Sequence, residues 1–189
     1  APRDALEEVQ LLLEQASDNI RASAEAMIAA LIALFLYILL RFRKWQFSLA
    51  SIVALAHDTL FVIAAFAIAS LFGATFEIDQ VFIAAILTVI GYSINDTVIV
   101  FDRVRENMNL HQKWDLKETL NKSLNSTLSR TINTSLTIFF VLMSIFIFGG
   151  EVIRGFTFAL LIGIIVGTYS SMCIASPIVY DMLSRKKQA

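Results

Sequence analysis

The stretch GYSINDTVIVFDRVREN, residues 91–107, begins as the end of an apolar run and finishes as a charged one. Asp96 lies inside the apolar part, among Ile, Val and Phe side chains. Burying a carboxylate among apolar groups is costly unless it gains a partner or becomes neutral. Two questions follow from this stretch: what kind of structure contains the apolar run, and why an aspartate is placed in it.

The composition indicates a membrane protein. Of the 189 residues, 57% are hydrophobic and 16% are charged, which is too apolar for an ordinary soluble domain. Crossing the hydrocarbon core takes about 20 mostly apolar residues in a helix. Continuous runs of this length exclude barrel strands, so we predict an all-α bundle of five transmembrane helices. The predicted spans are residues 24–40, 47–72, 78–101, 131–148 and 155–180.

The basic residues predict the orientation of the chain. Twelve of the 15 Lys and Arg residues lie in the segments 41–46 and 102–130 and in the basic tail 185–189. Cytoplasmic loops carry the excess of Lys and Arg, so we expect the C-terminus in the cytoplasm and residue 1 outside it. The net charge of −1 gives no reason to expect a nucleic-acid partner.

Two segments outside the spans show helical periodicity. Residues 1–23 carry a heptad seam that continues into the first span, which predicts one long helix from about residue 3 to 40, with its first half in water. No basic region precedes the apolar run, so we do not expect a signal peptide. Residues 115–128 form an amphipathic pattern that opens with a capping box at Asp115 and Glu118. This second helix fits either anchoring at the lipid surface or a specific docking role.

Four ionisable residues of the spans are candidates for function: Asp96, Arg130, Asp58 and His57. A charge near the bilayer centre costs on the order of 3 kcal/mol, so each needs a partner, a water-filled cavity or a neutral form. Burial favours a neutral carboxyl, whereas a nearby guanidinium favours the ionised one. We therefore expect Asp96 and Arg130 to form a proton switch, with Asp58 and His57 in the same relay. The alternatives are a structural carboxyl, an interfacial Arg130 and a packing His57.

Polar and small residues near these four complete the candidate site. The hydroxyls of Thr127, Thr131, Thr134 and Thr137 recur at three- and four-residue steps, so they are expected along one helix face with Arg130. The supporting polar residues around the switch are Ser93, Asn95, Thr97, Thr131 and Thr134. Such hydroxyls also serve as hydrogen-bonding contacts between helices.

Other features indicate structure rather than chemistry. Gly163 and Gly167 form a GxxxG pattern that allows close helix packing. Asp102, Arg103, Arg105 and Glu106 lie where the third span reaches the interface, and we expect them to be solvated. The single Cys173 is expected to be a packed, inert thiol. No nucleotide motif, metal cluster or catalytic triad is evident, so we expect neither an enzyme nor a cofactor, and no metal site.

Several blocks of the sequence resemble one known family. The stretch GYSINDTVIVFDRVREN, followed by NSTLSRTINTS, GGEVIRGFTFALLIGIIVGTYSS and IASP, is similar to the membrane region of the SecF family, the partner of SecD in bacterial protein export. LYILLRFRKWQFSL and the His57–Asp58 pair fit as well, so the resemblance covers about residues 24–184. The residues of these blocks are most similar to the SecF half of a fused SecDF.

This resemblance implies a membrane domain of the resistance-nodulation-division superfamily in the bacterial inner membrane. It implies a SecD-like half, the Sec translocon, preprotein and lipids as partners, with protons as the coupling ion. The family's aspartate in the Asn-Asp-Thr block and arginine in the Ser-Arg-Thr block correspond to Asp96 and Arg130. The implied function is proton-driven assistance of late preprotein export.

The chain also departs from the family pattern. It has five predicted spans, and residues 1–23 stand where the family has a first membrane helix and a periplasmic domain. We expect this segment to be of non-family or engineered origin. Two functions remain open: the energy-coupling part of a translocase subunit, and a membrane scaffold that keeps the fold without transport. A small-molecule exporter of the same superfamily would need a long periplasmic substrate domain, which this sequence does not contain.

Overall fold

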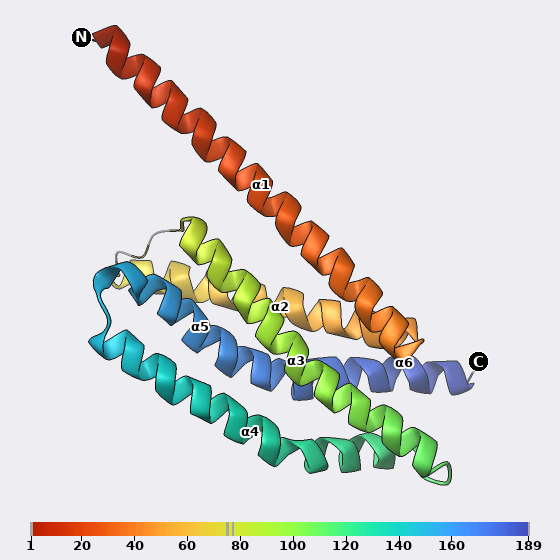
Figure 1. The fold of residues 1–189 in the computed structure, drawn as a ribbon. Coiled ribbons are helices and arrows are strands. Elements are labelled where there is room, and N and C mark those ends of the chain that lie inside the picture. Colours follow the sequence, from red (N-terminus) through yellow and green to blue (C-terminus); the bar gives the residue numbers. More distant parts are fainter. Residues whose placement is uncertain (1, 75, 77, 189) are drawn as a thin grey trace.

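A computed structural model describes residues 2–74, 76 and 78–188 of the chain. Helices account for nearly all of these residues, and no strand occurs among them. The elements in chain order are α1 (Pro2–Phe42), α2 (Trp45–Leu71), α3 (Gln80–Leu110), α4 (Leu116–Phe148), α5 (Glu151–Ser170), the π-helical segment η1 (Ser171–Ala175) and α6 (Ser176–Gln188). Figure 1 shows α2 to α6 as a layered bundle from which α1 diverges.

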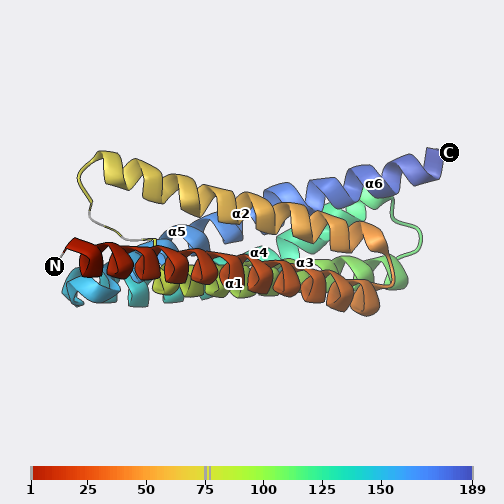
Figure 2. The same cartoon turned by 90° about the horizontal axis from the view of Figure 1, so that it is seen from above.

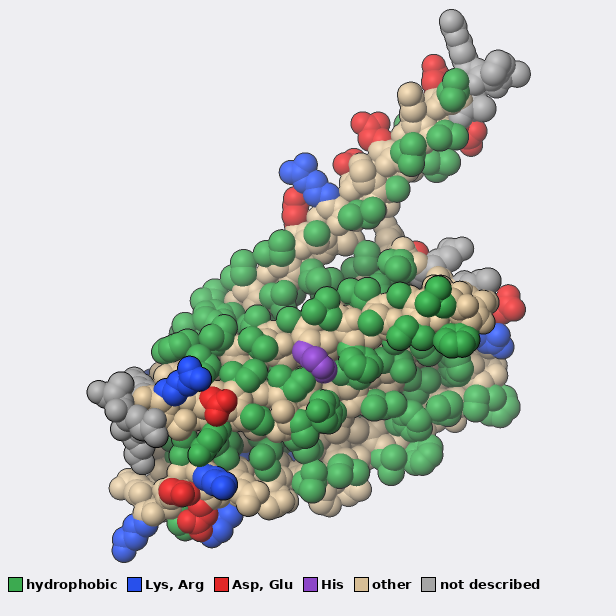
Figure 3. All heavy atoms as spheres, turned by 180° about the vertical axis from the view of Figure 1, so that it is seen from behind, with side chains coloured by type: hydrophobic (Ala, Val, Ile, Leu, Met, Phe, Trp, Pro, Cys, Tyr) green, Lys and Arg blue, Asp and Glu red, His purple; other side chains and the backbone are tan. Residues whose placement is uncertain are grey.

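Five helical stretches are long and apolar enough to cross a membrane: Leu6–Phe42, Trp45–Leu71, Gln80–Leu110, Leu116–Phe148 and Glu151–Arg185. The last of these runs continuously through α5, η1 and α6. On the face shown in Figure 3, hydrophobic side chains cover the middle of the bundle, while Lys, Arg, Asp and Glu gather toward its ends and along the protruding arm. The all-α membrane fold predicted from the sequence is therefore confirmed.

The long N-terminal helix α1 is continuous with the first span, as predicted. Its seam residues Leu6, Val9, Leu13 and Ile20 are all exposed. Contact with the core begins only in its second half, where Met27, Leu31 and Leu34 pack against it and Ile38 and Phe42 are buried. Figure 1 shows the C-terminal end of α1 at the bundle and its N-terminal end projecting away from it, and Figure 2 shows from above that α1 runs lengthwise over the bundle.

The predicted helix 115–128 and the predicted span 131–148 form a single helix, α4. The capping box is present, because the Asp115 carboxylate accepts a hydrogen bond from the Glu118 backbone N–H at 2.6 Å. The polar run between the two segments does not break the helix. Its hydroxyls bond to the preceding turn, as Thr127 does to Ser123 and Ser135 does to Thr131. The amphipathic pattern thus marks the start of a long span rather than a separate surface helix.

The closest packing in the bundle joins α3 and α5. A Cβ added at Gly163 would overlap the Val89 side chain, and one added at Gly167 would lie 3.0 Å from the Ser93 Cβ. Both glycines are buried. The GxxxG face of α5 therefore lets the two helices approach closely, and it brings α5 next to the turn of α3 that carries Ser93 and Asp96.

Helix α5 passes into α6 through the π-helical segment η1. Pro177 follows this segment, and a proline has no N–H with which to continue the ladder of the preceding turn. The Ser176 hydroxyl donates to the Ser171 carbonyl oxygen at 3.0 Å, which satisfies one of the acceptors in this region. Widened turns of this kind are frequent at functional sites, and here the segment directly follows Ser170.

Candidate functional site

The first buried carboxylate, Asp58, ties three helices together. Its side chain on α2 has no solvent exposure. The Oδ2 atom accepts hydrogen bonds from the Ser93 hydroxyl of α3 at 2.5 Å and the Ser170 hydroxyl of α5 at 2.7 Å. The Oδ1 atom lies 3.1 Å from His57 Nδ1. Both oxygens of Asp58 are therefore engaged, which is the condition under which a charge can be buried at acceptable cost.

Helix geometry explains how Asp58 comes to this position. The buried residues Ala50, Ala54, Asp58, Val62 and Phe66 recur at every fourth position of α2 and form one face toward the core. Asp58 is the only charged member of that row. Because Gly167 leaves room for the Ser93 side chain, the hydroxyls of α3 and α5 reach the same carboxylate oxygen.

The second buried carboxylate, Asp96, has a different environment. It is 1% exposed on α3, and its Oδ2 atom has no hydrogen-bond partner among the described residues. The neighbouring hydroxyls are engaged elsewhere: Ser93 donates to Asp58, and Thr97 donates to the Ser93 carbonyl oxygen at 3.1 Å. Asn95, also expected to support the switch, is exposed. Asp96 is thus buried and partly unsatisfied.

Arg130 is exposed on α4. Within the described part of the chain, no ion pair or hydrogen bond joins it to Asp96. Thr134 is exposed and bonds to the Arg130 carbonyl oxygen. By contrast, Thr131 is 1% exposed and its hydroxyl has no partner in the described residues. Buried polar atoms without partners are rare, and two of the three found here belong to Asp96 and Thr131.

A row of buried hydroxyls runs along α4. Its members recur at every fourth position: Thr119, Ser123, Thr127, Thr131 and Ser135. Asn107 of α3 donates to Ser123 at 2.8 Å, and Ser135 lies 2.9 Å from the Tyr92 hydroxyl and 2.6 Å from the Thr168 hydroxyl. The predicted stripe shares Thr127 and Thr131 with this row. Thr134 and Thr137, the other two predicted members, are exposed and bond to their own helix.

Ser170 is the member of the Asp58 cluster that the sequence analysis did not assign to the site. Its position three residues after Gly167 was the available signal, because this places it on the same face of α5. Only the packing of α5 on α3 shows that this face meets Asp58.

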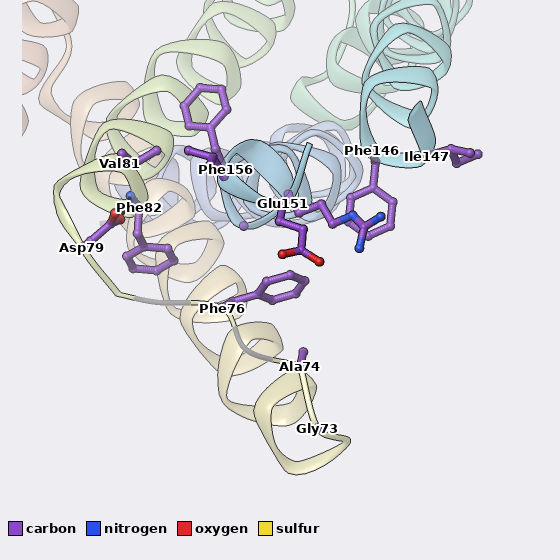
Figure 4. Close-up of a pocket in the computed structure, with 13 residues that line it drawn as sticks. Gly73, Ala74, Phe76, Asp79, Val81, Phe82, Phe146, Ile147, Glu151 and Phe156 are labelled. Carbon is purple, nitrogen blue, oxygen red and sulfur yellow. Dashed lines mark hydrogen bonds between the residues drawn. The ribbon is translucent and has the colours of Figure 1, made fainter. Parts of the chain in front are cut away.

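A cavity of about 810 Å³ lies at one end of the bundle, between the α2–α3 connection and the neighbouring ends of α3, α4 and α5. Figure 4 shows Phe76, Phe82, Phe146 and Glu151 around it. Its lining includes none of Asp58, Asp96 and Arg130. The centroid of the Phe66 ring lies 5.6 Å from that of Phe76 and 4.4 Å from that of Phe82, and the Phe158 centroid lies 5.1 Å from that of Phe76, so the lining rings Phe76 and Phe82 belong to an aromatic cluster. This cavity is separate from the buried carboxylates.

The fold and the polar centre define a class: a multi-pass helical membrane protein with two carboxylates buried between its spans. Residues 6–185 match the family described as protein export membrane protein SecD/SecF, C-terminal. The chain belongs to this family. The matched range begins inside the segment 1–23, which the sequence analysis assigned to a non-family origin.

Individual relatives agree with this assignment. The chain is 50% identical over 173 residues to protein translocase subunit SecF of Rhodothermus marinus, which covers 90% of this chain and 55% of that protein. SecF of Petrotoga mobilis is 44% identical, covering 86% of this chain and 52% of that protein. The chain therefore spans about half the length of the SecF subunits it matches.

Solved structures show the same relationship. The crystal structure of SecDF from Thermus thermophilus superimposes with a TM-score of 0.76 at 42% identity, covering 87% of this chain and 22% of that one. A SecDF structure in the super-membrane-facing form gives a TM-score of 0.75 at 44% identity, with 84% and 21% covered. The relationship to SecF-type translocase subunits, predicted from the sequence blocks, is confirmed.

Proposed function

We propose that this chain is the membrane part of a SecF-type subunit in a translocase that uses the proton motive force to assist late preprotein export. The names of its relatives supply the class, protein translocase subunit. The observation that carries the proposal is Asp96, a buried carboxyl with one oxygen free of hydrogen bonds in the described structure. A group in this condition exchanges a proton at low structural cost, since no existing contact has to be broken.

In the proposed cycle, ionised Asp96 pairs with Arg130, directly or through water, and protonated Asp96 releases it. The unpaired arrangement described above corresponds to the released state. One charge crossing the membrane is worth about 2.3 kcal/mol per 100 mV, which is enough to bias two arrangements that differ by a few kcal/mol. Thr131, whose hydroxyl has no partner in the described structure, is the proposed hydrogen-bonding neighbour in the paired state.

Asp58 and His57 have a second role in the proposed relay. Asp58 accepts hydrogen bonds from Ser93 and Ser170 on one oxygen, and His57 adjoins its other oxygen. Asp58 then holds α2, α3 and α5 in register while Asp96, one turn beyond Ser93, exchanges the proton. This division of roles explains why two carboxylates are retained in one membrane bundle.

A SecD-like half is the proposed partner on the face formed by α3 and α4. Thr88 and Asn95 of α3 are exposed, and so are four polar residues in the middle of α4: Arg130, Asn133, Thr134 and Thr137. Polar groups at this depth are not expected to face lipid tails. We therefore place the partner here, with the ends of α1 and α4 that carry the Lys and Arg excess in the cytoplasm of a bacterial inner membrane.

The test replaces Asp96 by Asn in a full-length SecF-type subunit containing this chain, assembled with its SecD-like half in vesicles. The amide keeps the shape of the side chain but cannot gain or lose a proton, so proton flux and proton-driven export should both be lost. Asp181→Asn, the same change at an exposed position of α6, is the matched control and should leave both intact. Full proton-driven export by Asp96→Asn would refute the switch. Loss of export with an unchanged proton flux would favour the scaffold function instead.

A further inference from the structure

The charged residues at the end of α3 are not simply solvated, in contrast to the expectation from the sequence. Asp102 accepts a hydrogen bond from Arg41 Nη2 of α1 at 2.7 Å. In return, Arg105 Nη1 donates to the Arg41 carbonyl oxygen at 2.9 Å. The side chain and the backbone of one α1 residue are therefore both held by α3. We refer to Arg41, Asp102 and Arg105 as the clamp.

The clamp meets a specific need of the α1 terminus. Arg41 is the penultimate residue of α1, and the carbonyls of a last helical turn have no partner within the helix. Arg105 supplies that partner from another helix. Arg43 then adopts a positive φ of 54°, and α2 begins at Trp45, so the chain reverses within two residues. The contacts of Arg41 with Asp102 and Arg105 hold this reversal of the chain against α3.

An apolar layer lies beside the polar contacts. Phe42 stacks on Phe47 at 5.3 Å, and both meet Phe101 edge-on at 6.0 and 4.9 Å. All three rings are almost fully buried. The two side chains of the ion pair remain 40% and 43% exposed, and ion pairs with such exposure contribute little alone. The joint therefore combines the ion pair, the Arg105 contact and the three rings.

Apart from this joint, the described part of α1 is held only by its second half, where Met27, Leu31 and Leu34 pack against the core and Ile38 is buried. Residues 6–22 of α1 are all exposed, and Figure 1 shows this part of the helix leaving the bundle at an angle. At about 1.5 Å per residue, the 41 residues of α1 extend for roughly 60 Å. Asp96 lies six residues before Asp102 on α3, less than two helical turns away. The clamp is thus the point at which the helix that carries Asp96 is joined to the helix that projects farthest from the bundle.

We infer that the clamp makes α1 a lever driven by α3. A shift or rotation of α3 at Asp96 is transmitted through Asp102 and Arg105 to Arg41 and moves the exposed N-terminal half of α1. In this role Asp102 and Arg105 are positioning residues that need not carry protons. That α3 moves when Asp96 exchanges a proton rests on the proposed function. The connection between α3 and α1 through the clamp is a separate property that can be tested without it.

The test measures distances between spin labels in the full-length subunit with Cys173→Ser as background. One pair, Gln15→Cys and Thr88→Cys, reports α1 against α3; a second pair, Thr88→Cys and Val152→Cys, reports the bundle itself. Asp102→Asn and Arg105→Gln should make the first distance distribution lose its narrow peak and leave the second unchanged. The charge swap Arg41→Asp with Asp102→Arg should restore the narrow peak. Asp181→Asn is the matched control.

Two outcomes would overturn the lever. A first distribution that stays as narrow in Asp102→Asn and Arg105→Gln as in the unmodified chain would show that the clamp does not position α1. If the distribution of the second pair, Thr88→Cys and Val152→Cys, also broadened, the Arg41→Asp and Asp102→Arg swap would decide between the two explanations. A swapped protein in which the second distribution becomes narrow again but the first does not would reject the inference. Failure of the lever can be distinguished from failure of the proton switch. Asp96→Asn is predicted to abolish export while the distance distribution between the labels at positions 15 and 88 stays narrow.

Discussion

The two buried aspartates differ in what surrounds them. Asp58 has Ser93 and Ser170 on one oxygen and His57 on the other, whereas Asp96 has one oxygen without a partner among the described residues. Both are at most 1% exposed. Equal burial therefore does not mean an equal role. A fully bonded carboxylate stabilises the packing around it, whereas a buried carboxylate with an unsatisfied oxygen costs the fold stability and is expected where function requires it.

The strongest test of this difference is Asp58→Ala. The substitution leaves two buried hydroxyls and a histidine without their acceptor, and each unsatisfied buried group costs about 1–3 kcal/mol. We expect the free energy of unfolding in mixed micelles to fall by about 3 kcal/mol. Asp96→Ala provides the comparison and should lower it far less. Equal losses for the two variants would mean that the hydrogen bonds of Asp58 do not distinguish it.

Ser170→Ala sharpens the comparison with a smaller change. It removes one of the two hydroxyls on Asp58 Oδ2 and leaves Ser93 in place. Hydrogen bonds between membrane helices contribute about 0.6–2 kcal/mol, so a loss of about 1 kcal/mol is expected in the same unfolding assay. Ser184→Ala on α6 is the control, because its hydroxyl bonds only within its own helix. A Ser170→Ala variant as stable as this control would contradict the assignment.

The same contrast occurs within the hydroxyl row of α4. Ser135 joins Tyr92 and Thr168, whereas Thr131 has no partner in the described structure. Ser135→Ala should therefore destabilise the bundle by about 1 kcal/mol, while Thr131→Val should be neutral or slightly stabilising. Thermal unfolding of both variants in one detergent provides the measurement. A larger loss for Thr131→Val would indicate a hydrogen bond at Thr131 in the folded protein.

The smallest effect on stability is expected for Asp96→Asn. The amide replaces a carboxyl that has one free oxygen, so the free energy of unfolding should change by no more than about 0.5 kcal/mol. Export measured on the same preparation should nevertheless be lost. A variant that unfolded readily would show that Asp96 resembles Asp58 in supporting the fold.

The sequence predicted the spans and the buried carboxylates because hydropathy and helical spacing are local properties. It did not assign Ser93 to Asp58, because Ser93 lies one turn from Asp96 and 35 residues from its actual partner. Thr127 and Thr131 allow the polar face of α4 to continue through either Thr134 or Ser135, and only contact with Tyr92 and Thr168 selects Ser135. The clamp was missed for the same reason, since its partners Arg41 and Asp102 are far apart in the chain.

The π-helical segment Ser171–Ala175 sets the phase between two halves of one long helix. Each residue in an α-helix advances the side chains by about 100°, and a π-helical turn accommodates one residue more than an α-helical turn. Ser170 before the segment faces Asp58, and Val179 after it is fully buried in the core. If these residues wound as a regular α-helix of the same length, Val179 would turn away from the core by roughly a quarter of a revolution, whereas deleting one residue would restore regular winding and keep Val179 facing the core. The π-helical segment therefore absorbs one extra residue, so that Ser170 and Val179 on one continuous span both face the bundle.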